Sequence, residues 1–433
     1  MRPQRQLQPG TRTALALTAI ALATIAWGLI ASGAGAGLGT PNPPFFLIYD
    51  PEFGGGEGVL WLLLLGACAA GAAALVRAAP SALAFLLGIV VLGLGARLAL
   101  AGIRDGTAGW YSMFGLDPEG GNEYLPALPA LHSLGLHDFL DRFAELSPSL
   151  PIHPSAHPPG LLLITDWLGI DTPQAFAVLV IGAGIAAVPL TFWAARRLEL
   201  EPFQARAAAA MLAFSPAAMV YGVASADALY ATLGIAAVPL LVGGGWAGRV
   251  AGAVVLALAS FFSWALLAVG AFAALLVALR ERLAEGIKLG LLIAAAIVIF
   301  YGLLYAVSGY DPLGVLQAAN EAYDLGISNA RPWIFWVFGS PVAFAVLTGA
   351  PVAWYAARAL GTGNAIALAL AAVILIAAVL GFSKAETERI WLFFGPLLCL
   401  AAAAIVPRER VPLVIGLLAA QALLVELMAE TIW

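Results

Sequence analysis

Side chains capable of acid-base chemistry gather in one polar stretch of the chain, residues 104–172. Its carboxylates include Asp105, Asp117 and Glu123, and apolar segments flank the stretch on both sides. A carboxylate that apolar neighbours desolvate holds a proton more tightly, which suits it to take a proton from a hydroxyl. We expect Glu123, beside Tyr124 at the start of a helix-like run, to be such a base, with Asp105 and Asp117 as alternatives.

All four histidines lie in the same stretch: His132, His137, His153 and His157. Prolines around His153 and His157 predict that residues 150–160 are too stiff for an ordinary helix, so the helical i,i+4 spacing of many metal sites is not available. A divalent metal ion is therefore an alternative cofactor to which no ligand is assigned. In the favoured interpretation His157 hydrogen-bonds within the loop or to substrate, while His132 and His137 are surface residues.

The composition places these residues beside a membrane. Of 433 residues 62% are apolar and only 10% are charged, with a mean hydropathy of +0.96, which excludes an ordinary soluble domain. The net charge is -5 and no Lys/Arg cluster is dense enough to follow phosphates, which excludes a basic nucleic-acid binder. Cys68 and Cys399 lie inside apolar runs, where a thiol usually behaves as a buried hydrophobe.

The apolar runs predict an all-α polytopic membrane protein with about thirteen transmembrane helices. The loop 104–172 is the main extramembrane feature, and the short run 161–170 within it is expected to be a juxtamembrane helix. The spans are expected at about 13–33, 58–76, 80–102, 174–195, 204–222, 228–243, 250–262, 264–280, 288–307, 333–357, 363–382, 390–406 and 411–430. The pair 250–262 and 264–280 is short for two crossings, so a hairpin and a single bent or re-entrant segment are both open.

The charges predict the orientation. Arg2, Arg5 and Arg12 precede the first span, so the N-terminus is expected in the cytoplasm and, after thirteen spans, the C-terminus outside. With this topology most Lys and Arg residues fall inside, whereas nearly all carboxylates and every histidine fall outside. We therefore expect an integral protein of the plasma (inner) membrane with its chemistry at the external face.

Short motifs carry a family resemblance over roughly residues 95–245. Asn122-Glu123-Tyr124, His157-Pro158-Pro159, Ala194–Leu198, Ser215-Pro216 and Asp227 follow one another in the order of motifs in the GT-C superfamily of membrane glycosyltransferases. In these motifs the chain resembles protein O-mannosyltransferases and the aminoarabinose and lipopolysaccharide sugar transferases. It lacks the paired Asp-Glu of the mannosyltransferases.

The resemblance implies one GT-C-like domain over residues 1–433 that transfers a sugar, with inversion, from a polyprenyl-phosphate donor to an acceptor hydroxyl. The acceptor would be an envelope glycan, lipid or protein, and membrane lipids would surround the chain. Glu123 would be the base. The residues that would contact substrate are Tyr124, His153, His157 and Asp227. Asp227 has an equally weighted alternative as the N-cap of the next helix.

The same reaction needs cations for the departing phosphate. Lys384 and Arg389 lie at an expected external helix start, where charge and free N–H groups both favour phosphate. Arg331 and Arg97 are further candidates, and Arg97 lies inside a span, where an unpaired guanidinium is costly. In the alternative reading Lys384 and Arg389 pair with nearby acids or reach lipid phosphates.

Two other functions compete with the enzyme. A transporter or flippase of a lipid-linked or small polar substrate would place ionisable residues near the bilayer midplane, as Arg97, Asp166 and Glu426 allow. A noncatalytic scaffold would use the loop 104–172 only to bind a partner.

Overall fold

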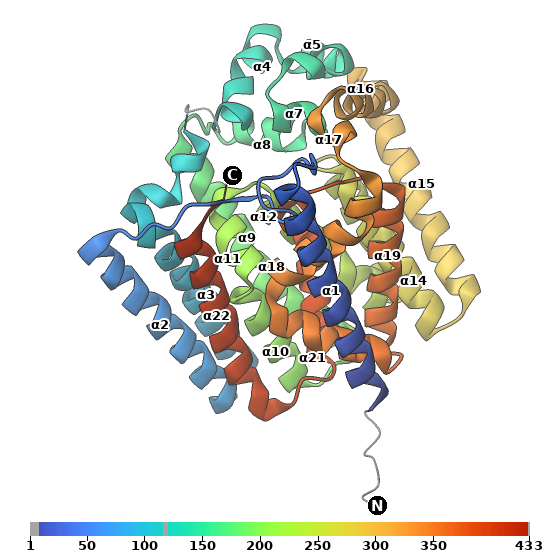
Figure 1. Cartoon of the computed structure of the whole chain (residues 1–433). Helices are drawn as coiled ribbons and strands as arrows, with labels where there is room; N and C mark the ends of the chain where they lie inside the picture. The colour runs from blue at the N-terminus through green and yellow to red at the C-terminus, as the bar shows by residue number, and fades with distance from the viewer. Residues whose placement is uncertain (1–7, 116–119, 432–433) are drawn as a thin grey trace, which may run out of the picture.

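The computed structural model describes residues 8–115 and 120–431. Within these residues the chain is a bundle of helices whose one end is covered by the short helices of residues 106–172 (Figure 1). We call this the loop end of the bundle. Asp117, one of the candidate bases, lies outside the described residues.

Each of the thirteen predicted apolar segments coincides with helical structure. Among the described residues, seven helices are long and apolar enough to cross a membrane: α1 (Pro9–Gly33), α2 (Gly55–Ala78), α3 (Ala82–Asp105), α9 (Pro173–Arg197), α15 (Leu283–Ser308), α18 (Trp333–Gly361) and α22 (Val411–Met428). An eighth crossing is formed if α10 (Pro202–Ala213) and α11 (Pro216–Ala224) are one span. They meet at an angle of 51° because Pro216 cannot continue the hydrogen bonding of α10.

The remaining apolar helices are shorter than a usual span. They are α12 (Asp227–Gly243), α13 (Trp246–Ser260), the 3-10 turn η6 (Trp264–Leu266) with α14 (Leu267–Arg280), α19 (Ala365–Leu380), and η7 (Leu392–Phe394) with α21 (Gly395–Ala403). The all-α membrane class is therefore confirmed. The count of about thirteen crossings stays a prediction, since length and composition identify seven or eight.

Burial separates inner helices from outer ones. The helices α10, α11 and α21 are buried on nearly every side, as expected of helices that are apolar all round. By contrast α1, α2 and α15 expose large apolar side chains, among them Leu22, Leu63 and Val298. A surface of this kind needs lipid rather than water as its neighbour.

The helices α13 and α14 form a hairpin. The turn between them lies at the loop end, where the backbone N–H of Gly160 donates to the carbonyl of Phe261 over 2.9 Å. At the other end Arg249, near the start of α13, pairs with Glu281, directly after α14. Both outer ends of the hairpin thus lie on the same side of the bundle, so of the two arrangements left open for residues 250–280 the structure shows the hairpin.

Residues 106–172 form a set of short elements rather than one folded sheet or long helix. They are η1 (Gly106–Trp110), η2 (Ser112–Phe114), η3 (Gly120–Asn122), η4 (Leu125–Ala127), α4 (Leu128–Leu134), α5 (Leu136–Asp141), α6 (Phe143–Leu146), η5 (Ser147–Ser149), α7 (Ile152–Ala156) and α8 (Gly160–Trp167). The helix expected at 161–170 is found as α8. The expectation that 150–160 contains no helix is wrong for α7, because Pro154 lies in its first turn, where no backbone N–H is needed.

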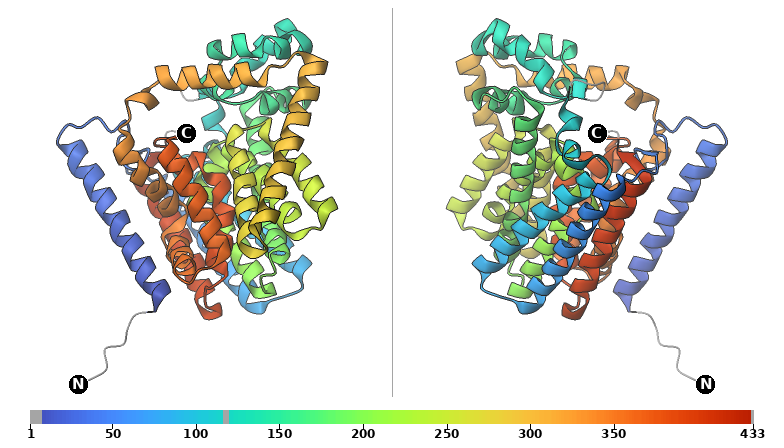
Figure 2. Two further views of the ribbon diagram at one scale, coloured as in Figure 1. Left: turned by 90° about the vertical axis from the view of Figure 1, so that its right-hand side faces the viewer. Right: turned by 90° about the vertical axis from the view of Figure 1, so that its left-hand side faces the viewer.

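Two further elements were not expected from the sequence. The segment after α15 folds into α16 (Pro312–Leu325) and α17 (Ile327–Ala330), and α16 runs across the loop end of the bundle (Figure 2). The carboxylate of Asp311 caps α16 by accepting from the N–H of Leu313.

A small antiparallel sheet joins segments far apart in the sequence. Strand β1 (Leu47–Tyr49) pairs with β2 (Ala429–Thr431), with Ile48 opposite Glu430. Arg104, at the end of α3, forms ion pairs with Asp50 and Glu52 just after β1. Two short elements remain. The helical turn η8 (Arg408–Arg410) precedes α22, and the helix α20 (Thr387–Ile390) precedes η7.

Candidate functional site

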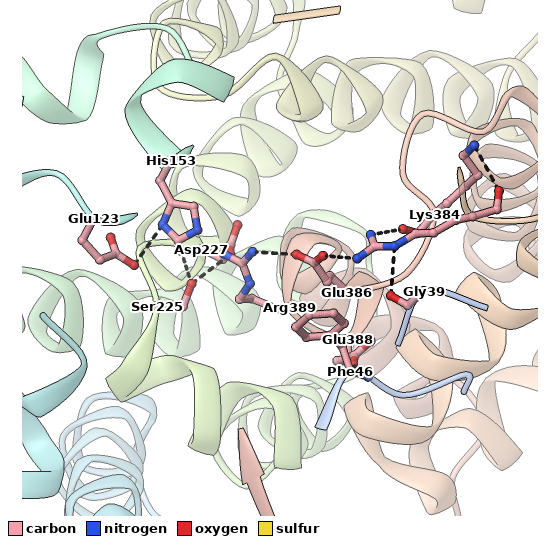
Figure 3. A network of polar contacts seen from close by, with 11 residues as sticks. Gly39, Phe46, Glu123, His153, Ser225, Asp227, Lys384, Glu386, Glu388 and Arg389 are labelled. Carbon is pink, nitrogen blue, oxygen red and sulfur yellow. Dashed lines mark hydrogen bonds and ion pairs between the residues drawn. The ribbon is translucent and has the colours of Figure 1, made fainter. Parts of the chain in front are cut away.

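A buried polar network lies at the loop end of the bundle (Figure 3). It joins the loop 106–172, the start of α12 and the segment 383–390, and it contains six of the candidate residues: Glu123, His153, Asp227, Lys384, Arg389 and Arg331. Side chains separated by more than 200 residues in the sequence are thereby brought into one place.

The acidic part of the network is a carboxylate held by a histidine. Glu123 lies between η3 and η4, and its Oε1 is 3.0 Å from Nδ1 of His153 on α7. Both residues are buried, with 4% and 8% of their surface exposed. The second carboxylate oxygen, Oε2, has no hydrogen-bond partner among the described residues. This arrangement fixes the carboxylate and leaves one oxygen able to accept a proton.

Next to this pair lie two tyrosines and a histidine. The hydroxyls of Tyr124 and Tyr230 are 2.5 Å apart, and the ring of His157 lies 5.2 Å from that of Tyr230. Burial lowers the pKa of His157 to about 4, so its imidazole is neutral at pH 7. Burial likewise raises the pKa of Tyr124, which stays a neutral phenol. These groups can exchange hydrogen bonds with a polar substrate but add no charge.

Asp227, the first residue of α12, is bonded to the cationic segment. Its Oδ2 is 2.9 Å from Nη1 of Arg389 and also accepts from the hydroxyl of Ser225 at 2.9 Å. The N-cap position of α12 is occupied by Ala226 and Asp227 is the first helical residue, so the N-cap interpretation of Asp227 is not what the structure shows. Burial by itself would lower the pKa of Arg389, but the carboxylates of Asp227 and Glu386 raise it.

The cationic segment is a chain of alternating charges. Arg389 pairs with Glu386 at 3.2 Å, and Glu386 pairs with Arg331 at 2.8 Å. Arg331 then donates to the carbonyl of Lys384 at 2.6 Å, while Nζ of Lys384 donates to the carbonyl of Arg331 at 3.3 Å. Positive φ angles at Ala385 and Glu386 make the tight turn that brings these groups together. The ammonium also lies 5.7 Å from the ring centre of Tyr323 on α16.

Lys384 therefore differs from the two arginines. Among the described residues it forms no ion pair with a carboxylate, whereas Arg331 pairs with Glu386 and Arg389 pairs with both Asp227 and Glu386. The alternative in which Lys384 and Arg389 pair with nearby acids thus applies to Arg389 only.

Glu388 is a buried acid of the same segment. Its Oε1 accepts from the backbone N–H of Phe46 at 2.6 Å, and the side chain is 1% exposed. Burial raises the pKa of Glu388 to about 7. From the sequence alone, Glu386 and Glu388 are only the nearby acids with which Lys384 and Arg389 could pair. Tyr230 was not considered at all, although it lies three residues after Asp227 and hence on the same helix face.

Two candidate residues lie outside the network. Arg97 on α3 is buried in the bundle, where its guanidinium packs against Gly184 of α9 and Gly222 of α11. Its Nε and Nη1 have no hydrogen-bond partner among the described residues. Asp105 is exposed at the end of α3, and no ion pair or hydrogen bond of its side chain joins it to Glu123 in the part of the chain that the structure describes. The structure therefore does not bring Arg97 or Asp105 to the network.

The other histidines lie on the surface. The side chain of His132 is 2.6 Å from Asp166, and that of His137 is 3.7 Å from Asp138. Within residues 8–115 and 120–431, no group of three His, Cys, Asp or Glu side chains is placed to hold a metal ion.

Compared with protein-family models, curated proteins and solved structures, the chain shows no match. Its function must be inferred from the network itself. The network offers a fixed carboxylate with an unoccupied oxygen, neutral hydrogen-bonding rings, and a cationic segment that contains one ammonium without an ion pair.

Proposed function

We propose that this chain is a membrane glycosyltransferase of the GT-C type. It transfers a sugar from a polyprenyl-phosphate donor to an acceptor hydroxyl at the external face of the plasma membrane, and the acceptor is an envelope glycan, lipid or protein. One observation carries the proposal: Glu123 from the loop and the cations of residues 384–389 contribute to the same buried network at one end of the bundle.

The chemistry is a single displacement. Glu123 Oε2 takes the proton of the acceptor hydroxyl, and the acceptor oxygen forms a bond to the anomeric carbon of the donor sugar. The bond from that carbon to the phosphate oxygen breaks, and its electron pair leaves with the polyprenyl phosphate. Attack on the face opposite the leaving group inverts the anomeric centre. His153, which touches Glu123 and not the reacting atoms, is a positioning residue.

Lys384 is the principal phosphate contact in this proposal. Arg389 and Arg331 are already neutralised by Asp227 and Glu386, so a phosphate gains less from them than from an ammonium without an ion pair. The two arginines hold the turn that presents Lys384, whose ammonium stabilises the charge that develops on the leaving phosphate. Tyr124, His157 and Asp227 border the position of the sugar and provide hydrogen bonds to it.

The decisive experiment replaces Glu123 by Gln in the full chain reconstituted in vesicles with a polyprenyl-phosphate sugar. We expect Glu123→Gln to insert and fold normally but to lose transfer, because the amide cannot accept the proton. Glu145→Gln is the matched control, since Glu145 lies in the same loop with its side chain 73% exposed and pairs only with Arg142. Transfer by Glu123→Gln at the wild-type rate would contradict the proposal.

A transporter or flippase is the second candidate, and Arg97 is the observation that favours it. Ionisable groups buried inside a span often mark substrate pathways through membranes, and two nitrogens of the Arg97 guanidinium have no hydrogen-bond partner in the part of the chain that the structure describes. Accumulation of substrate in vesicles without any covalent product, abolished by Arg97→Met but not by Glu123→Gln, would support transport instead of transfer.

A further inference from the structure

A groove lies at the end of the bundle opposite the loop. Its volume is about 360 Å³, within the range of about 300–1,000 Å³ typical of small-molecule sites. It is bordered by the last turn of α2, the first turn of α10, and the turn η8 that leads into α22, and these three helix ends lie together at the bottom of the bundle in Figure 1. The lining residues are Val76, Arg77, Phe203, Arg408, Glu409 and Pro412.

Two arginines of this groove are available for an anion. Among the described residues neither Arg77 nor Arg408 forms an ion pair, although other arginines at this end do, such as Arg249 with Glu281 and Arg280 with Glu199. The guanidinium of Arg408 lies 5.3 Å from the ring centre of Phe203, which holds it in place and leaves its edge open to hydrogen bonding.

The third charge of the groove is of opposite sign. Glu409 follows Arg408 directly, is exposed, and also has no ion pair among the described residues. Two guanidiniums suit a phosphodiester, for which they offer paired N–H donors, and a carboxylate beside them suits a primary ammonium. A purely anionic headgroup would meet Glu409 as a repulsive neighbour.

The surroundings identify the source of this headgroup as a lipid. The helix that begins at the groove exposes Leu413, Leu417 and Leu424 along one face, spaced so that they form a continuous apolar stripe. Acyl chains would lie against this stripe while the headgroup enters the groove. A soluble phosphate compound would gain nothing from it.

We propose that the groove binds the headgroup of a zwitterionic phosphoethanolamine lipid, with its phosphate between Arg77 and Arg408 and its ammonium on Glu409. This site is separate from the network around Glu123, lies at the other end of the bundle, and does not depend on the reaction proposed there.

The test uses the full chain in nanodiscs of phosphatidylcholine, to which phosphatidylethanolamine or phosphatidylglycerol is added, and native mass spectrometry of the retained lipid. We expect the wild type to retain phosphatidylethanolamine in preference to both other lipids. Arg77→Ala and Arg408→Ala should each reduce that retention about tenfold, whereas Arg282→Ala, an exposed arginine at the same end outside the groove, should not change it.

Glu409→Gln tests recognition of the ammonium group separately from recognition of the phosphate. It should abolish the preference for phosphatidylethanolamine over phosphatidylglycerol while retention of phospholipid as such persists. Equal retention of the three lipids by the wild type would overturn the proposal, as would arginine variants that behave like the wild type. Protection against thermal unfolding by inorganic phosphate equal to that given by phosphatidylethanolamine would also overturn it, because the occupant would then not be a lipid.

Discussion

The guanidinium of Arg389 lies 2.9 Å from the carboxylate of Asp227, which precedes it by 162 residues. Both side chains are more than nine-tenths buried, so the pair is shielded from solvent. Through it the segment 383–390 is attached to the start of α12, which in turn lies beside the loop that carries Glu123. The pair therefore attaches the segment that carries Lys384 to the helix whose Tyr230 contacts Tyr124, next to the proposed base.

Replacing one member of this pair should lower the free energy of unfolding more than replacing both. Arg389→Met leaves the carboxylate of Asp227 buried without its cation, and we expect a loss of about 3–5 kcal/mol in the free energy of unfolding. The double variant Asp227→Asn/Arg389→Met removes both charges and should regain much of that loss, while Glu386 keeps its partner Arg331. Thermal unfolding in detergent, combined as a double-mutant cycle, measures the coupling. Additive effects would show that the two side chains do not interact.

His153 should affect turnover more than substrate binding. His153→Leu removes the group that holds Glu123 Oε1, and we expect kcat to fall about a hundredfold with little change in KM, because a misplaced base reacts poorly. His153→Gln, whose amide can donate to the same oxygen, should recover part of the activity. Steady-state kinetics with a polyprenyl-phosphate sugar separates the two constants. A change confined to KM would assign His153 to substrate binding instead.

Lys384 should show the opposite pattern. Lys384→Met removes the ammonium without an ion pair, so KM for the donor should rise about tenfold or more, whereas Lys384→Arg should preserve binding. The chain offers one matched control in its only other lysine, Lys288, which is exposed and pairs with Glu285. Lys288→Met should behave like the wild type. An unchanged KM in Lys384→Met would leave the phosphate without its principal contact.

Glu388 should make stability depend on pH. Burial raises its pKa from 4.5 to about 7, so between these values the unfolded chain has lost a proton that the folded chain retains. The free energy of unfolding therefore falls as pH rises through this window, by up to about 3 kcal/mol, and is constant above it. Glu388→Gln, which keeps the oxygen that accepts from Phe46, should remove this fall. Unfolding measured from pH 4 to pH 8 tests it, and parallel profiles for variant and wild type would contradict it.

Arg97 should lower the free energy of unfolding of the protein. The residue is 1% exposed and two of its guanidinium nitrogens lack partners within residues 8–115 and 120–431, so Arg97→Met should raise the free energy of unfolding by about 1–4 kcal/mol. Sugar transfer should persist in this variant, since Arg97 lies outside the network around Glu123. Thermal unfolding and the transfer assay on the same preparation give both answers. Loss of transfer at unchanged or higher stability would return Arg97 to the donor site.

The sequence predicts the helical segments well because a bilayer permits few alternatives. Apolar runs must fold as helices there, and each predicted span coincides with helical structure, although 204–222 is divided between α10 and α11. The short elements were harder to predict: α7 forms despite Pro154, and α16 packs against α6, η5 and α7 of the loop. Strands β1 and β2 could not have been found, because their pairing joins residues near opposite ends of the sequence.

The candidate site was predictable in its residue types but not in its pairing. Glu123, His153, Asp227 and Arg389 all stood out as polar side chains next to apolar segments, and the structure places them in one network. The sequence could not show that Arg389 would be neutralised and Lys384 would not, since this depends on the turn at Ala385. The sequence also could not show that Arg97, another charged residue next to apolar ones, packs against Gly184 and Gly222 away from this network.

The pairing of β1 with β2 also has a consequence for biosynthesis. A ribosome adds about 5–20 residues per second, so residues 47–49 wait roughly 20–80 seconds before their partner strand has been made. During this interval Phe46 also lacks the carboxylate of Glu388. The first helix can thus insert into the bilayer early, whereas the segment that follows it pairs with its partner strand only after nearly all of the chain has been translated.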